Sequence, residues 1–195
     1  MLTYPPIAVG SRLWDEVSAT RCGRWEDAGD GSGSGNLAGR VFRVKIERDD
    51  LSRPEVQALL REHLSNMHEL SPPESVHALD LRALRSSDIT FWTVWDQSVL
   101  LGCGALKQLS PTHGEVKSMR TPAALRRRGA GRQVLTHIIA EAKSRGYRQL
   151  SLETGSSDAF SPARTLYARF GFTACGPFAD YVPDSNSVFM SLTLA

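Results

Sequence analysis

Cysteine, long apolar stretches and net charge are all scarce in this sequence, and each shortage excludes a class of protein. Three cysteines in 195 residues, Cys22, Cys103 and Cys175, give neither a disulfide framework nor the paired spacing of a zinc site. No apolar run approaches the roughly 20 residues that cross a bilayer. The amino terminus also lacks the basic and apolar regions of a signal peptide. We therefore expect a cytoplasmic protein without a membrane partner.

The charge balance excludes a protein that coats nucleic acid over its whole surface. Lys and Arg number 23 against 21 Asp and Glu, a formal net charge of +2, so any basic feature must be local. The histidines at positions 63, 68, 77 and 137 form no clustered ligand set, and we expect no metal. With 41% apolar residues, the chain can bury a core without disulfides or metal.

The chain divides near residue 40. Residues 25–40, "WEDAGDGSGSGNLAGR", are dense in Gly, Ser and Asp and show no hydrophobic period. Such a segment buries too little apolar surface to offset the entropy of ordering it. We expect a disordered or poorly structured extension over residues 1–40 and a single functional domain over residues 41–195.

Strand and helix patterns alternate through residues 41–195. Alternating or continuous apolar runs predict six strands, at residues 41–47, 90–95, 99–109, 114–121, 148–154 and 187–194. The three residues "DQS" between the second and third of these suit a hairpin.

Helical periodicity predicts helices at residues 52–70, 125–144 and 161–170, and a short helix within 71–84. The first would begin with a capping box from Ser52 to Glu55, and the third would end at Gly171. The order of elements predicts an α/β (α+β) fold: a mixed sheet with helices on both faces.

Five arginines crowd the start of the helix expected at 125–144: Arg120, Arg126, Arg127, Arg128 and Arg132. A helix amino terminus already carries partial positive charge, so these side chains call for an anion. The loop "RRRGAG" has two glycines that let backbone amides approach a phosphate closely. From charge alone, the anion could be a nucleic-acid backbone, a small phosphorylated ligand or solvent ions.

The loop resembles the signature of the GCN5-related N-acetyltransferases (GNAT), Gln/Arg-x-x-Gly-x-Gly/Ala, with Arg126, Gly129 and Gly131 in register. Glu115, eleven residues earlier, matches a strand glutamate that many members carry, and "ARTLYARFGF" matches a late family motif. The resemblance spans about residues 41–195, and the tail is similar to a bacterial subgroup termed PhnO-like. It implies the GNAT fold, with a mixed, mostly antiparallel sheet, splayed central strands and helices on both faces.

The resemblance also implies acetyl-CoA as cosubstrate. The pyrophosphate would lie on the loop amides and the pantetheine arm would pair with the preceding strand. The cofactor-binding residues would then be Met119, Arg120, Thr121, Arg126, Arg127, Arg128, Gly129, Ala130, Gly131 and Arg132. The family often has an asparagine where this chain has Phe160, so a nearby serine, Ser156, Ser157 or Ser161, would have to supply that polar contact.

Two residues are the leading catalytic candidates. Tyr167, within the late motif, would protonate the departing thiolate, because phenol and thiol acidities are similar; its alternative role is aromatic packing. Glu115 would accept the proton of the amine, directly or through water, although it could instead pair with Lys117 at a strand end. Glu153 and His113 are further candidate bases.

The implied activity is direct acetyl transfer from acetyl-CoA to a primary amine of a small molecule or peptide. The alternatives are a non-catalytic acyl-CoA-binding module and a nucleic-acid-binding module that uses the arginines. We expect acetyl-CoA and a small amine as partners and no nucleic acid. A homodimer is a possible assembly. The sequence leaves the acceptor unassigned, although Asp180, Tyr181 and Asp184 could contact a cationic amine.

Overall fold

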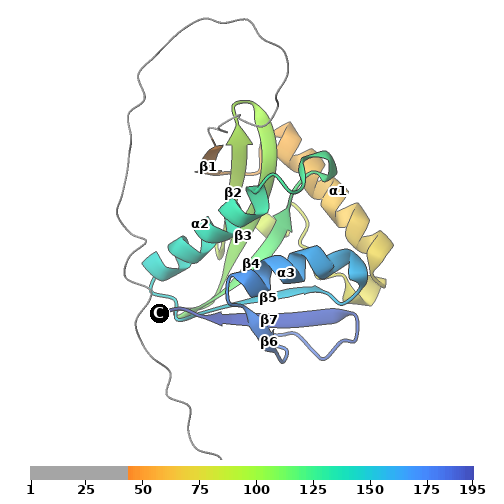
Figure 1. Ribbon diagram of the computed structural model, residues 1–195, viewed down its shortest axis with the longest axis vertical. Coiled ribbons are helices and arrows are strands. Elements are labelled where there is room, and N and C mark those ends of the chain that lie inside the picture. Colours follow the sequence, from red (N-terminus) through yellow and green to blue (C-terminus); the bar gives the residue numbers. More distant parts are fainter. Residues whose placement is uncertain (1–43) are drawn as a thin grey trace, which may run out of the picture. The chain divides into compact units, whose positions relative to one another are not determined.

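The computed structural model describes residues 44–195, which build one seven-stranded sheet with helices packed on it (Figure 1). The extension expected at residues 1–40 lies outside the described residues. The strands are β1 Val44–Arg48, β2 Ile89–Asp96, β3 Val99–Ser110, β4 His113–Arg120, β5 Gln149–Gly155, β6 Thr173–Cys175 and β7 Ser187–Thr193. Their order in the sheet is β1-β2-β3-β4-β5-β7-β6. Every neighbouring pair is antiparallel except β4 and β5, which run parallel.

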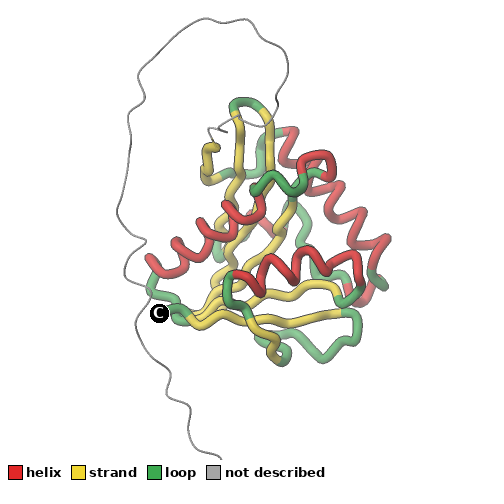
Figure 2. Tube along the Cα trace, in the orientation of Figure 1, coloured by secondary structure: helices red, strands yellow, loops and turns green. Residues whose placement is uncertain are grey.

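Three helices cover the sheet. The helices are α1 Pro54–Leu70, α2 Ala130–Ser144 and α3 Ser161–Arg169, and short 3-10 turns occur at Pro73–Ser75, Ala83–Arg85, Ala123–Leu125 and Asp158–Phe160. Helices α2 and α3 lie over the near face of the sheet in Figure 2 and share one apolar core with it. Helix α1 contributes to a second core with residues from β2 and β3. This confirms the predicted mixed sheet with helices on both faces.

Two tryptophans of β2 show that both faces of the sheet are covered by an apolar core. Trp92 is buried in the core under α2, and Trp95 is buried in the core under α1. Residues three apart on a strand point to opposite faces. Because both faces are covered by helices, β2 is buried along its whole length, including its polar residues Thr90, Thr93 and Asp96.

The structure corrects the local predictions at four places. The capping box is wrong: α1 is preceded by Arg53 as N-cap, and the Ser52 amide donates to the Asp50 carboxylate instead. The proposed short helix within 71–84 is reduced to two 3-10 turns, the first flanked by consecutive prolines. Helix α2 begins at Ala130 because Gly129 is left-handed, with φ of 86°. Strand β6 was not expected, since three residues are too few to show a period.

Close packing between β3 and α2 predicts the effect of a small substitution. A Cβ on Gly104 would lie 2.6 Å from Met119 Sδ and 2.6 Å from Val134 Cγ1. Gly104→Ala should therefore lower the free energy of unfolding by about 1–3 kcal/mol, because the core must shift to admit the methyl group. Denaturant unfolding measures this loss. Gly176→Ala is the control, because a Cβ there has nothing within 4 Å, and equal losses in the two variants would refute the packing argument.

Candidate active site

Strands β4 and β5 separate in the middle of the sheet. They pair at three positions, His113 with Gln149, Gly114 with Leu150 and Glu115 with Ser151, and the pairing ends there. Figure 1 shows the two strands close together at their starts and diverging toward their ends. Backbone groups past the last pair face the gap between the strands, where an extended ligand can pair with them as an added strand would.

A bulge in β4 follows the last pair with β5. Cys103 pairs with Arg120 and Ala105 pairs with Lys117, so the span from Lys117 to Arg120 contains one more residue than its β3 partner. Ser118, inside this span, adopts a left-handed φ of 51°. Bulges bend a strand and increase its twist. The bulge therefore bends β4 just past the last pair with β5.

The arginine-rich loop follows β4 directly and leads into α2. Arg127 and Gly129 both have positive φ, at 62° and 86°. No side chain caps the amino terminus of α2, so its first amides keep their hydrogen-bonding capacity for another acceptor. Turns that include left-handed residues aim successive amides at one point and form an anion-binding concavity. The loop has the backbone form of a phosphate cradle.

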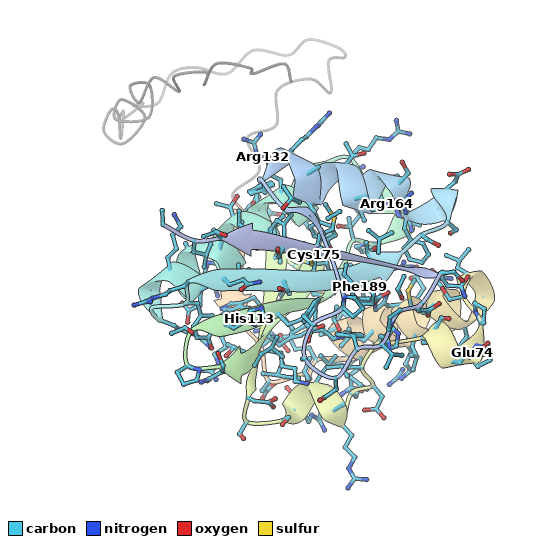
Figure 3. All side chains as sticks on the ribbon, turned by 90° about the horizontal axis from the view of Figure 1, so that it is seen from below. Glu74, His113, Arg132, Arg164, Cys175 and Phe189 are labelled. Atoms are coloured by element: carbon cyan, nitrogen blue, oxygen red, sulfur yellow. The ribbon has the colours of Figure 1, made fainter. Side chains whose placement is uncertain are left out.

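The arginines of the loop divide into two groups. Arg126, Arg127, Arg128 and Arg132 are exposed, and none takes part in an ion pair among residues 44–195. Figure 3 shows Arg132 on the same side of the sheet as Arg164 of α3. Arg120 differs, because its Nη2 lies 2.8 Å from Glu62 Oε1 and also donates to Asn66 on α1. Four of the five arginines are thus available to an anion, and the fifth ties β4 to α1.

Glu115 is part of a buried network on the face of β4 opposite α2. Its Oε1 accepts a hydrogen bond of 2.6 Å from the Tyr181 hydroxyl and lies 3.2 Å from Lys117 Nζ. The residue is 2% exposed. Lys117 also donates to the Tyr181 hydroxyl and to the His77 carbonyl. The predicted pairing of Glu115 with Lys117 is present, and Tyr181 completes it.

Glu153 lies on β5 two residues past the last pair with β4. It accepts a hydrogen bond of 2.8 Å from Ser187 on β7. Burial raises the pKa of Glu153 above its usual range, and the Ser187 hydrogen bond opposes this in part. A carboxylate with a raised pKa is a stronger proton acceptor near neutral pH.

Tyr167 lies on α3 and is 7% exposed. It packs against Phe172, with ring centroids 5.9 Å apart. Burial raises the pKa of the Tyr167 phenol, and the negative charge of Glu153 raises it further. The structure thus gives Tyr167 the aromatic packing that was its alternative role.

The remaining candidates have structural partners. His113 Nε2 lies 2.8 Å from Ser151 Oγ, and burial lowers the pKa of His113. The Phe160 ring packs directly against Gly155, because a Cβ on Gly155 would lie only 2.3 Å from the ring. Arg164 donates to the carbonyls of Gly155 and Ser157 at the end of β5, a contact that sequence reasoning did not anticipate.

Sequence reasoning also missed how the predicted residues are joined. Tyr181 was noted as a contact for a cationic amine, yet it holds Glu115 in place from 66 residues away. Lys117 links β4 to residue 77 and to the loop before β7. A signal existed in the sequence, since Glu115 and Lys117 give this strand a charged face where an apolar one would normally pack.

No group of three or more His, Cys, Asp or Glu side chains among residues 44–195 could hold a metal ion. No described helix is long and apolar enough to span a membrane.

Comparison with known protein families identifies the family of this chain. Residues 56–172 match the model of the Acetyltransferase (GNAT) family. The chain belongs to this family. The fold is accordingly the GNAT fold, and membership makes the chain an enzyme of the acetyltransferase class.

Three curated relatives carry related names. The N-acetyltransferase YsnE of Bacillus subtilis, itself uncharacterized, is 57% identical over 77% of this chain and 100% of its own length. The uncharacterized N-acetyltransferase YedL of Escherichia coli is 50% identical over 76% of this chain and 94% of its own. An IAA acetyltransferase of Azospirillum brasilense is 37% identical over 77% of this chain and 98% of its own.

Solved structures share the fold. A proposed acyl-CoA N-acyltransferase of Klebsiella pneumoniae superposes with a TM-score of 0.63 and 26% identity, over 79% of this GNAT chain and 99% of the other. A GNAT acetyltransferase of Elizabethkingia anophelis, solved with acetyl-CoA bound, has a TM-score of 0.55 and 16% identity over 77% and 98% of the two chains. The second likeness concerns the fold alone.

The contact between Arg120 and α1 predicts a pH effect on stability. Burial, and then the charge of Arg120, lowers the pKa of His63 to about 4 from 6.5. Its Nδ1 is buried without a partner among the described residues. The unfolded chain therefore binds a proton at His63 more readily than the folded chain does. The contribution of neutral His63 to the free energy of unfolding is fully present above pH 6.5 and is lost as the pH falls toward 4.

Lowering the pH from 7 to 5 should reduce the free energy of unfolding of the wild type. In His63→Gln this reduction should be smaller by about 2 kcal/mol. Urea unfolding at the two pH values measures the difference. His68→Gln, a change of an exposed histidine on the same helix, should lose as much stability as the wild type. If His63→Gln did the same, His63 would not be the group responsible.

Proposed function

We propose that this GNAT protein is an acetyl-CoA-dependent N-acetyltransferase that acetylates a primary amine of a small molecule or peptide by direct transfer. One observation carries the proposal. The gap between β4 and β5 opens beside an arginine-lined helix amino terminus, and the two together fit an extended arm that ends in a pyrophosphate. A cytoplasmic location and a homodimer stay predictions. So does the PhnO-like subgroup, since none of the relatives above bears that name.

The cofactor-binding residues follow from this geometry. Amides of residues 127–132 would receive the pyrophosphate, and the exposed arginines at 126, 127, 128 and 132 would add charge-assisted hydrogen bonds. The backbone of Met119 and Thr121 would pair with the arm. In this role Arg120 contributes its backbone, because its guanidinium is engaged with Glu62.

Three proton movements accompany the transfer, because the ammonium nitrogen loses two protons and the sulfur gains one. Acetyl-CoA supplies a thioester carbon, to which the neutral amine nitrogen forms a bond as the carbon–sulfur bond breaks. A carboxylate of the chain first takes the proton from the ammonium group. Tyr167 then gives its phenolic proton to the departing sulfur, and the second proton that the attacking nitrogen must lose returns to the Tyr167 phenolate. Proton transfers of this kind contribute about 10²–10⁴-fold to rate.

Of the two carboxylates proposed as base, Glu153 has the better geometry. Glu115 is 2% exposed, and one of its oxygens already meets both Tyr181 and Lys117. To reach a substrate, Glu115 would have to give up these contacts. Glu153 is partly exposed, has one hydrogen bond and has a raised pKa. We therefore assign proton acceptance to Glu153 and positioning to Glu115.

A charge effect would link proton acceptance by Glu153 to proton donation by Tyr167. Burial raises the pKa of Tyr167, and the charge of ionised Glu153 raises it further. When Glu153 takes the proton of the amine, its negative charge disappears, and the pKa of Tyr167 falls. The phenol thus becomes a stronger acid after the amine has been deprotonated, when the departing sulfur needs a proton.

Tyr167→Phe tests the acid. Release of the CoA thiol, measured with acetyl-CoA over a panel of small primary amines, should show kcat reduced about 100-fold, because the leaving thiolate loses its proton donor. Binding of acetyl-CoA should be unchanged.

Tyr147→Phe is the matched control. Tyr147 is also buried in the core that contains Tyr167, and its hydroxyl has no partner among the described residues. Its kcat should stay within about twofold of the wild type. If kcat were equal in the two variants, Tyr167 would not be the proton donor. Binding of acetyl-CoA without CoA release from the wild type would instead favour the non-catalytic acyl-CoA-binding module.

A further inference from the structure

The amine must reach Glu153 from the α1 side of the sheet. Leu152 of β5 lies in the core under α2 and α3, so the neighbouring Glu153 points to the other face. The β7 partner of Glu153 is Phe189, whose ring centroid lies 5.4 Å from that of Tyr181. Since α2 and α3 cover the first face, an acceptor approaches past whatever lies over the gap on the second.

The loop before β7 is tied to β4 on this second face. The Tyr181 hydroxyl donates to Glu115 Oε1 over 2.6 Å and accepts a hydrogen bond of 2.7 Å from Lys117 Nζ. Glu115 belongs to the last pair between β4 and β5, and Lys117 lies two residues past it. Tyr181 therefore lies where the gap begins.

The other end of the same loop is tied to β5. Ser156, the first residue after β5, donates its amide to the Asn186 carbonyl and its hydroxyl to the Ser185 carbonyl, each over 2.9 Å. Residues 181–186 therefore run from β4, at the start of the gap, to the end of β5. The gap lies between these two points, so the segment crosses it.

A turn from another part of the chain lies along this segment. Asn186 Nδ2 donates to Ser75 Oγ over 3.2 Å, and the His77 ring lies edge-on to the Tyr181 ring, with centroids 5.0 Å apart. These two contacts are at opposite ends of the crossing segment, so the turn follows it across the gap.

Residues 75–77 and 181–186 together form a loop bridge over the α1 side of the gap. Under it, Glu115 is only 2% exposed. A peptide binds through several residues in an open groove, because its chain continues beyond the reacting amine. The hydrogen bond from Asn186 to Ser75 joins the two halves of the loop bridge and closes such a groove. A small amine needs only to pass beside it.

We propose that the acceptor is a small free amine and that the loop bridge excludes peptides and proteins from the site. This proposal rests on the acetyltransferase function proposed above and narrows its acceptor class. Asn186 is then a specificity-determining residue, because its side chain makes the hydrogen bond that joins the two halves of the loop bridge.

Acceptors that present the same amine with and without an attached chain test the proposal. The panel pairs the amide of each common amino acid with a tetrapeptide amide that begins with the same residue, and it adds tyramine and agmatine as further small amines. With acetyl-CoA, CoA release should give a kcat/KM at least about tenfold higher for the small member of each acetylated pair. Melting temperatures of the CoA-bound enzyme with each compound give a second readout that needs no turnover.

Asn186→Ala opens the loop bridge and leaves the backbone contacts with Ser156 in place. It removes the hydrogen bond to Ser75, so the ratio of kcat/KM values within a pair should narrow by at least about threefold, through a gain for the peptide. Hydrogen exchange of the amides in residues 176–186 should become faster, and binding of acetyl-CoA should stay unchanged.

Ser65→Ala is the matched control. The Ser65 hydroxyl donates to Glu69 over the same 3.2 Å, on the exposed side of α1. Its loss should change neither the ratio within a pair nor the exchange of residues 176–186.

The possible outcomes separate this proposal from the one it rests on. Acetylation of the peptides as fast as the amides, or of peptides alone, would overturn the acceptor class. So would acetyl-CoA binding with no small amine acetylated or raising the melting temperature. If Asn186→Ala speeds exchange yet keeps the wild-type ratio, the loop bridge does not select the acceptor. If acetyl-CoA itself neither binds nor releases CoA, the acetyltransferase function fails as well.

Discussion

The site depends on one interruption of backbone pairing, where β4 and β5 stop exchanging hydrogen bonds after Glu115 and Ser151. Each strand follows its other neighbour from that point. Strand β5 stays paired with β7 along its whole length, and β4 stays paired with β3 through the Ser118 bulge. The parallel pair therefore separates while each strand keeps its antiparallel partner. An opening in the middle of a sheet leaves polar backbone groups that need a partner, which an extended ligand can supply.

The arginine-rich loop, proposed to bind the pyrophosphate, is fixed to the same opening. Strand β4 runs into the loop, and α2 packs tightly on β3 behind it. A Cβ on Gly102 would lie 2.9 Å from the Arg120 carbonyl and 3.5 Å from Ala130 Cβ, so β3, β4 and the start of α2 meet without space for a side chain. The direction of β4 therefore sets the position of the loop. On the other face, Lys117, Tyr181 and Glu115 hold the loop before β7 against the sheet.

Much of the fold, and the backbone form of the loop proposed to bind the cofactor, could be predicted from sequence, because both rest on local signals. Strand and helix periods, the hairpin after Asp96 and the left-handed Gly129 all act over a few residues. The acceptor side could not be predicted in the same way. It depends on Tyr181 reaching Glu115 across 66 positions and on Arg120 turning toward α1. Which carboxylate stays free follows from these long-range contacts, which no local pattern encodes.

Unfolding of the protein in the presence of acetyl-CoA tests the central claim, that the gap and the arginine loop form one acetyl-CoA site. A ligand that binds the folded chain at 100 times its Kd adds about 2.7 kcal/mol of stability. We expect acetyl-CoA and CoA to raise the melting temperature by about 5–10 °C, and AMP, which lacks the pyrophosphate and the arm, to raise it far less. A melting temperature unchanged at millimolar acetyl-CoA would contradict the account.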